Sequence, residues 1–445
     1  MSQTGLSQIP TAPGRLPLIG HAHMVTGDPR ELLLRAPEIG PIVRVYLGPQ
    51  ASYMLTTPDL IRDVSLGRAG AFHREPMREA IHELVSGATN VLSGPEHDLR
   101  RRLIAPVFRQ RRLTEYGVTV AAIADDWAGS LASGAQADLR SSVHELVMRT
   151  MLATLFRAES DADEIDVIRE RTPWLLSEVI IRGALPKIAR QLRVLANRRF
   201  IAHSRQVRAA LRSLIERRRH EPDEGDMLSA LLHHVDEETG ATLSDDNLVD
   251  ELLLSLAASI GSQTSIFSWL VYETSRAPEI GAKIRDELDS VIGSRPVEVG
   301  DVPALSYLRN VLNETLRLWA PWISILTSDG PVRIGSAEFP DGTNILFSPL
   351  MVHLQDQYFP HAATFDPDRW ESGSGDRDVM MAFGLGQRHC PGSQFALLSI
   401  TLQAAALFSR WDIRLPADFT VKPQAKDFVL SPASLPVVFS PRRPG

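Results

Sequence analysis

The chain has 445 residues, of which 44% are hydrophobic, so it can bury a large core. Its 47 basic and 54 acidic side chains give a formal net charge of −7, which argues against a general nucleic-acid binder. A single cysteine, Cys390, leaves no intramolecular disulfide and is typical of a reducing cytoplasm. No uninterrupted apolar stretch reaches about 18 residues, so we expect no membrane span.

The N-terminal part of the chain favours strands and coil. Residues 1–20 form a leader in which residues 9–20 are rich in proline and predict extended coil, because proline fixes φ and removes a donor. Two β-prone runs, residues 42–47 and 51–56, are joined across Gly48-Pro49-Gln50 and predict a hairpin. From about residue 95 to 320 the apolar residues recur at helical spacing.

Within that region the helical pattern is clearest in three segments, residues 113–157, 164–182 and 186–218. A second β-rich region covers residues 325–349. We expect a further helix from near Pro391 to about Arg410, followed by strands and turns.

The most unusual element is a long segment from Ser244 to Arg276, in which Gly261 is the one residue that could break a helix. Ser244 can cap a helix at its start, and Ala277-Pro278 ends it. At about 1.5 Å per residue such a helix spans roughly 50 Å, enough to cross a whole globular domain. The sequence therefore predicts a helix through the centre of the fold, with two ordinary helices bent at Gly261 as the alternative.

Cys390 lies in the segment Phe383-Gly384-Leu385-Gly386-Gln387-Arg388-His389-Cys390-Pro391-Gly392. The glycines allow the backbone to approach a flat cofactor closely. A helix that begins after the cysteine would supply backbone donors and a positive dipole end, which lower the pKa of the thiol. A lone cysteine is usually a buried structural residue, but this frame favours a thiolate ligand.

This segment resembles the cysteine-ligand loop of the cytochromes P450 of the soluble bacterial type. The resemblance implies a mainly α fold, a single helical domain over residues 1–445 with small β-sheets. It also implies haem b as cofactor, with Cys390 as the axial ligand of the iron. Phe383, Gly384 and Gly392 would belong to the same cofactor-binding loop.

Three further motifs follow the family order. Glu314-Thr315-Leu316-Arg317 is similar to its Glu-x-x-Arg helix, and Phe365-Asp366-Pro367-Asp368-Arg369-Trp370 is similar to the segment whose arginine joins that pair. The resemblance implies a buried, structural Glu314–Arg317–Arg369 network that braces the cysteine loop. His97-Asp98-Leu99-Arg100-Arg101 resembles the pair that binds the haem propionates, a role implied here for His97, Arg101 and Arg388.

The chain departs from the family on the long central helix, where oxygen is activated. The family pattern Ala-Gly-x-acid-Thr aligns with Ala258-Ser259-Ile260-Gly261-Ser262. Ala258 and Ser262 would be the catalytic positions; Ser262 keeps a hydroxyl that can relay protons, but Gly261 cannot replace a carboxylate. Either ordered water or a substrate hydroxyl fills this gap, or the chemistry is non-standard, such as oxidative coupling, ring formation or the use of peroxide.

The resemblance implies a monooxygenase that activates dioxygen and hydroxylates an apolar small molecule. Electrons would come from NAD(P)H through a separate ferredoxin and ferredoxin reductase. A terpenoid or another natural product of secondary metabolism is the preferred substrate, by analogy alone. A non-catalytic haem-binding sensor is the alternative outside enzymes. We expect a cytoplasmic monomer.

The substrate pocket is expected to be mostly apolar. By family position its walls would include Trp322, Ile323, Ile325 and Leu430. The segment from Phe72 to Gly87 would fold over the entrance.

Overall fold

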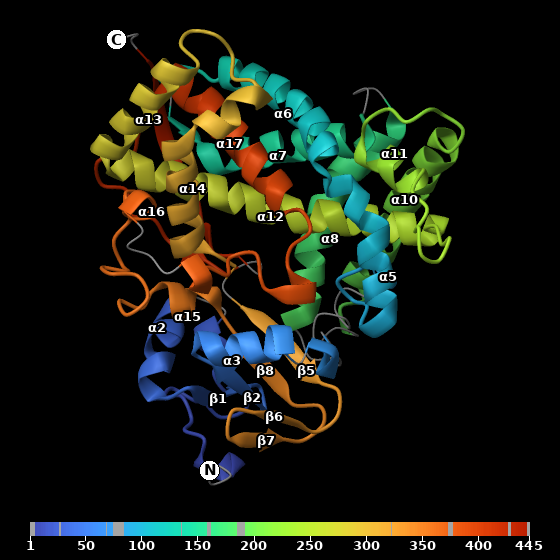
Figure 1. Cartoon of the computed structure of the whole chain (residues 1–445), viewed down its shortest axis with the longest axis vertical. Coiled ribbons are helices and arrows are strands. Elements are labelled where there is room, and N and C mark those ends of the chain that lie inside the picture. The colour runs from blue at the N-terminus through green and yellow to red at the C-terminus, as the bar shows by residue number, and fades with distance from the viewer. Residues whose placement is uncertain are drawn as a thin grey trace.

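A 32-residue helix, α12 (Asp245–Arg276), crosses the middle of the molecule in the computed structural model (Figure 1). The hydroxyl of Ser244 accepts a hydrogen bond from the Asn247 N–H at 3.3 Å, which is the predicted cap. The helix runs unbroken through Gly261, so the prediction of one long helix is confirmed and two bent helices are excluded. It ends before Pro278, the first residue of α13.

The structure describes residues 5–25, 28–67, 69–73, 84–134, 136–157, 162–184, 192–321, 323–372, 377–425 and 429–442. Besides α12, the α-helices are α1 (Ala22–Val25), α2 (Arg30–Ile39), α3 (Pro58–Arg62), α5 (Gly94–Ile104), α6 (Gln110–Ser130), α7 (Leu139–Phe156), α8 (Asp163–Ala184), α10 (Val194–Arg218), α11 (Met227–Leu232), α13 (Pro278–Val291), α14 (Ser306–Trp319), α15 (Pro349–His353), α16 (Arg369–Ser372) and α17 (Ser393–Arg410). Short 3₁₀ or π turns are η1 (Leu6–Gln8), η2 (Asp63–Gly67), η3 (Ala69–Ala71), η4 (Ala105–Phe108), η5 (Val299–Ala304), η6 (Arg377–Val379) and η7 (Gly386–Arg388).

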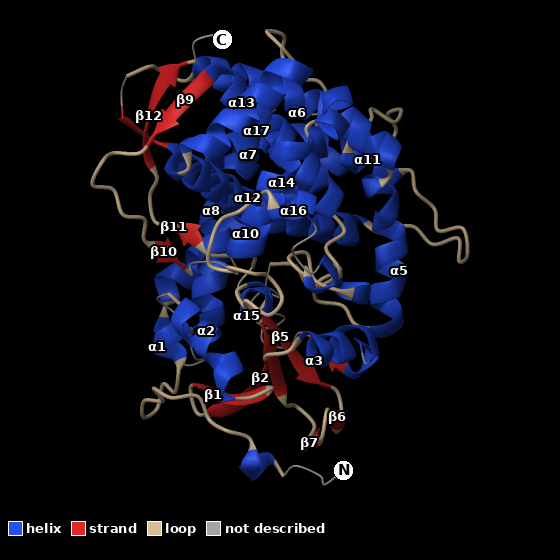
Figure 2. Ribbon diagram, turned by 60° about the vertical axis from the view of Figure 1, so that its left-hand side comes forward, coloured by secondary structure: helices blue, strands red, loops and turns tan. Residues whose placement is uncertain are grey.

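The strands form small sheets beside the helices (Figure 2). The largest has the order β1-β2-β8-β5-β3, from β1 (Ile42–Leu47), β2 (Gln50–Leu55), β8 (Asn344–Phe347), β5 (Ser324–Ser328) and β3 (Phe72–His73). The others pair β6 (Val332–Ile334) with β7 (Ala337–Phe339), β10 (Pro423–Gln424) with β11 (Ser431–Pro432), and β4 (Gln136–Asp138) with β12 (Pro436–Pro441) and β9 (Trp411–Arg414). The predicted hairpin is β1–β2, in which Ile42 pairs with Leu55.

The buried apolar side chains form a large cluster among the helices and a smaller one under the five-stranded sheet. In the large cluster α17 packs on α6, and α7 packs on α12. The predicted fold class, mainly α with small sheets, is confirmed. Over the described part of the chain, no helix combines the length and apolarity needed to cross a membrane.

The proline-rich leader has no helix or strand over residues 9–20, as the sequence predicts, but it packs against the sheet. It contains η1, and isolated bridges join Thr11 to Arg44 and Gly20 to Leu47. Ile9 and Ala12 are buried, because the apolar residues between the prolines cover the edge of the sheet. The leader is therefore part of the packed structure over its described residues.

Candidate active site

The Cys390 loop is closed by its own backbone. The N–H of Cys390 donates to the carbonyl of Phe383 at 2.8 Å, and the N–H of His389 donates to Gly386 at 3.0 Å. Gly384 and Gly386 lie in the left-handed region, with φ of 75° and 60°. A Cβ on Gly386 would meet the carbonyl oxygen of Ser65 at 2.7 Å. Gly386 is therefore required by the close approach of another protein segment, a reason that the sequence does not reveal.

The thiol of Cys390 is half-buried just before α17, which begins at Ser393. Burial raises the pKa of Cys390, while the N–H of Gly392 and the charge of Arg101 act in the opposite direction. The backbone donor next to the helix lowers this pKa as predicted, but burial outweighs it, so the pKa of the thiol is raised in the protein alone. A bound metal ion deprotonates a coordinating thiol outright, so the thiolate would owe its stability to the metal.

The three predicted propionate ligands gather around this loop. His97 is buried on α5, and burial followed by the charge of Arg388 lowers its pKa, while Asp98 raises it. Arg388 donates to the hydroxyl of Ser93 at 3.3 Å, a partner that the sequence does not indicate. The structure thus brings together side chains almost 300 positions apart, while their role in binding propionates stays a prediction.

Arg101 is the residue that supports the binding of a cofactor with carboxylate groups. Its guanidinium is half-buried and, among the described residues, makes no hydrogen bond or ion pair. The negative groups that interact with it electrostatically are Cys390 and Glu251. A desolvated cation without a counterion is costly, so this position suits an anionic ligand. The residues present therefore fit a flat, dicarboxylate cofactor bound by a thiolate.

The middle of α12 carries the two predicted catalytic positions. Between Leu254 and Ser262 seven residues of this helix remain accessible, which marks space that no side chain fills, and we call them the exposed strip: Leu254, Ser255, Ala257, Ala258, Ser259, Gly261 and Ser262. Ala258 is the most exposed. The Ser262 hydroxyl donates back to the carbonyl of Ala258 at 2.6 Å. Thr264 is buried, and at about 100° per residue it points well away from Ser262.

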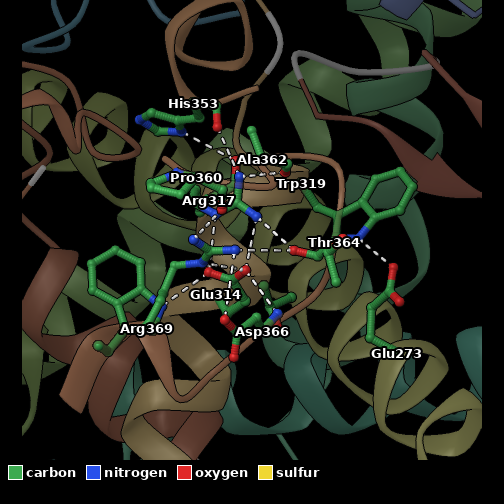
Figure 3. A network of polar contacts seen from close by, with 12 residues as sticks. Glu273, Glu314, Arg317, Trp319, His353, Pro360, Ala362, Thr364, Asp366 and Arg369 are labelled. Atoms are coloured by element: carbon green, nitrogen blue, oxygen red, sulfur yellow. Dashed lines mark hydrogen bonds and ion pairs between the residues drawn. The ribbon is translucent and has the colours of Figure 1, made fainter. Parts of the chain in front are cut away.

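The Glu314–Arg317–Arg369 network is fully buried and hydrogen-bonded (Figure 3). Arg317 binds both carboxylate oxygens of Glu314 at 2.8 and 2.9 Å, and Arg369 binds one at 3.0 Å. The indole N–H of Trp370 and the backbone N–H of Asp366 also donate to this carboxylate at 3.0 Å. The predicted cluster is therefore present, with Trp370 as an unpredicted member.

The remaining donors of the two arginines bind backbone carbonyls: Arg317 binds those of His353 and Ala362 at 2.7 Å and of Thr364 at 3.0 Å, and Arg369 binds that of Pro360 at 2.9 Å. These carbonyls belong to the irregular segment after α15. The network therefore fixes a stretch of chain that has little secondary structure of its own.

His353 connects this network to the cysteine loop. Its Nδ1 donates to the carbonyl of Arg317 at 3.1 Å, and its Nε2 accepts from the N–H of Met381 at 3.1 Å. Met381 in turn accepts from the N–H of Gly384 at 3.0 Å. Burial lowers the pKa of His353 to about 3, so the ring stays neutral and keeps one donor and one acceptor. The sequence carries no signal for this link.

The predicted substrate-pocket residues lie in different surroundings. Trp322 is outside the described residues, Ile323 is buried and Ile325 is half-buried. Leu430 is fully buried, and its carbonyl accepts from Ser265 at 2.7 Å and from the indole of Trp269 at 2.5 Å. Their role in a pocket stays a prediction.

Of the predicted entrance segment, Phe72 and His73 form β3, and residues 74–83 are outside the described residues.

A half-buried thiol, cations around it and an open strip on a central helix are the parts of a haem-thiolate site. The cytochrome P450 family model matches residues 10–439, and the chain belongs to this family of monooxygenases. It is 31% identical over 441 residues to cyclooctat-9-en-7-ol 5-monooxygenase of Streptomyces melanosporofaciens, covering 97% of this chain and 95% of that one. It is 29% identical to pentalenene oxygenase of Streptomyces avermitilis, with 98% of each chain covered. The fold matches the crystal structure of the cytochrome P450DA heme domain with a TM-score of 0.87 at 22% identity, over 100% of this chain and 99% of that one.

We expect Glu314→Gln to lower the free energy of unfolding by about 3–5 kcal/mol, because two buried arginines lose their counterion. Urea unfolding measures this effect. The matched control is Glu31→Gln, which breaks an exposed pair with Arg35 and should cost less than about 1 kcal/mol. Equal losses in the two variants would contradict a structural role for the network.

Arg101→Gln should weaken haem retention about tenfold or more, since a charged hydrogen bond contributes about 1.5–3 kcal/mol. Transfer of haem to an excess of apomyoglobin gives the rate of loss. Arg111→Gln, in which an exposed arginine of α6 is removed, serves as the control. Unchanged haem loss in Arg101→Gln would remove this residue from the propionate site.

Proposed function

We propose that this chain is a haem-thiolate monooxygenase that hydroxylates an apolar terpenoid, with Cys390 as the axial ligand and electrons supplied by a ferredoxin. The observation that carries the proposal is the convergence of Cys390, Arg388, Arg101 and His97, with Arg101 also interacting electrostatically with Glu251 of α12. The family membership supports the reaction class.

The haem, when bound, supplies the oxidative chemistry, and a thiolate ligand favours cleavage of the O–O bond. The protein binds and orients the participants. Arg101, Arg388 and His97 would hold the two propionates. The hydrogen bond from the N–H of Cys390 to the carbonyl of Phe383 holds the residue that carries the sulfur. Ala258 and Ser262 would face the side of the site where the substrate reacts.

The positive charge of the surface beside the cysteine loop supports the proposal that the electron donor is an acidic protein. A Cβ on Gly392 would contact the ring of Phe108 at 3.5 Å, so the end of η4 lies next to the loop. The next residues of the chain include two exposed cations, Arg109 and Arg111. An acidic one-electron donor such as a ferredoxin, itself reduced with NAD(P)H, would be attracted to this side of the iron.

The relatives support the substrate class. Those at about 30% identity include bacterial terpenoid-oxidising enzymes, named for pentalenene and for cyclooctat-9-en-7-ol. Two small residues, Ala257 and Ala258, and the half-buried Ile325 would offer an apolar surface to such a ring system.

Cys390→Ser should abolish the thiolate-type carbon-monoxide difference spectrum, because an alcohol oxygen cannot replace the sulfur as an anionic ligand. The measurement is the spectrum of the reduced holoprotein. A thiolate-type spectrum that survives this substitution would exclude Cys390 as the ligand and with it the proposed function.

The electron donor is tested in a single turnover with pentalenene as probe, comparing reduced ferredoxin and dioxygen with hydrogen peroxide. We expect oxidation with the ferredoxin, and Arg109→Glu should slow the reduction of the iron in a salt-dependent manner. Arg205→Glu, an exposed charge reversal on α10, should leave the rate unchanged. Oxidation with peroxide alone would favour the non-standard chemistry that Gly261 leaves open. Normal iron reduction without any turnover would favour a sensor.

A further inference from the structure

We propose that Glu251 replaces the missing acid of the central helix and supplies protons to the reaction site through Ser255, Ser259 and Ser262. This inference rests on the proposed monooxygenase function. The carboxylate of Glu251 lies earlier on α12 than Gly261 and on a neighbouring face of the helix. Four observations carry it: the burial of Glu251, its half-used carboxylate, its position on α12 and its neighbour Asp250.

Glu251 is a buried acid in the middle of the protein, with 3% of its surface exposed. One oxygen, Oε1, accepts all of its hydrogen bonds: from the N–H and the hydroxyl of Thr89 at 2.7 Å and from Arg100 at 3.1 Å. Among the described residues, nothing donates to the second oxygen, Oε2. Burial raises the pKa of Glu251, which favours a carboxyl that can carry a proton. The group is thus held at one oxygen and available at the other.

The serines lie along the same face of α12 as Glu251. With about 100° per residue, Glu251, Ser255, Ser259 and Ser262 fall within an arc of about 80°. The steps along the axis are about 6, 6 and 4.5 Å, and one water molecule with two hydrogen bonds spans such a gap. All three serines belong to the exposed strip, where water has access. The hydroxyl of Ser255 donates to the carbonyl of Glu251 at 2.8 Å, so it can accept a proton as it stands and turns away from that carbonyl to pass one on.

The electrostatic environment links this acid to the cofactor side. Arg101 interacts with both Glu251 and Cys390, so Glu251 lies near the proposed haem edge. Hydroxylation consumes one dioxygen, two electrons and two protons for each C–H bond converted to C–OH, and releases one water. The electrons come from the external one-electron donor. Each proton passes from the Oε2 of Glu251 along the serines to the oxygen that leaves as water, and Glu251 takes up a new proton from solvent.

Asp250 provides a matched comparison. It is equally buried, and its carboxylate accepts from the N–H of Gly87 at 2.7 Å and from Arg208 at 2.5 Å. Both acids therefore anchor the segment 87–89 to α12. Asp250 lies about 100° around the helix from Glu251 and off the line of serines. A purely anchoring role would make the two acids equivalent, whereas a proton-supplying role belongs to Glu251 alone.

The first experiment measures oxygen consumption by the holoenzyme with reduced ferredoxin, in water and in deuterium oxide. Glu251→Gln should lower the rate about tenfold or more and raise the solvent isotope effect, since positioned proton donors contribute about 10²-fold or more. Glu251→Asp should recover part of the rate, and Asp250→Asn should stay near the wild type. Urea unfolding of both variants separates lost stability from lost proton supply.

The second experiment does not depend on turnover. Difference infrared spectroscopy of the holoenzyme should show a protonated carboxyl band that shifts in deuterium oxide and is absent in Glu251→Gln. Ser255→Ala should slow the exchange of this band with solvent deuterium. If the band is missing in the wild type, or if Glu251→Gln and Asp250→Asn change oxygen consumption equally, Glu251 is an anchor only. A third outcome is possible, in which the band exchanges as expected but neither the wild type nor any variant consumes oxygen. In that case the proton route stands and the proposed function fails.

Discussion

The carboxylate of Glu314 is the interaction on which the site depends. It is fully buried and accepts five hydrogen bonds, two of them from Arg317 and one each from Arg369, Trp370 and the backbone of Asp366. Burying three charges is costly, and only complete pairing makes it tolerable. The two arginines then order the irregular segment 353–364 through its carbonyls. His353 extends this order to Met381 and hence to the loop that carries Cys390.

In this arrangement the residues that hold the loop in place are different from Cys390, the residue that would bind the iron. The ligand loop has no regular secondary structure beyond η7, so its shape depends on its own two backbone hydrogen bonds and on contacts outside it. The neutral ring of His353 and the close approach of Ser65 to Gly386 provide the outside contacts. Metal sites generally rely on such outer contacts to orient the ligand.

Local patterns predicted much of this correctly. The hairpin at residues 42–55, the cap at Ser244 and the length of α12 follow from turn chemistry and helical spacing. The buried charge cluster followed from the family resemblance, since an acid and a base three residues apart are usually exposed. The features that could not be predicted from the sequence depend on contacts between distant segments. His353, Ser93 and Ser65 act through partners 28 to more than 300 positions away, and no local pattern encodes them. The pKa of Cys390 was misjudged because a helix end is visible in a sequence and desolvation is not.

The roles of the buried charged groups differ with the number of hydrogen bonds that each group makes. Glu314 has every lone pair engaged, so it has nothing left to offer a ligand or a proton. Arg101 has no partner among the described residues, which is tolerable in the working protein only if an anion arrives. Glu251 lies between these cases, with one oxygen engaged and one open. A structural carboxylate gains stability from each further donor, so an oxygen left open on the face of α12 that lines the site is better explained by proton exchange than by anchoring. On this argument the loss of the family acid at Gly261 moves the proton source along the helix without removing it.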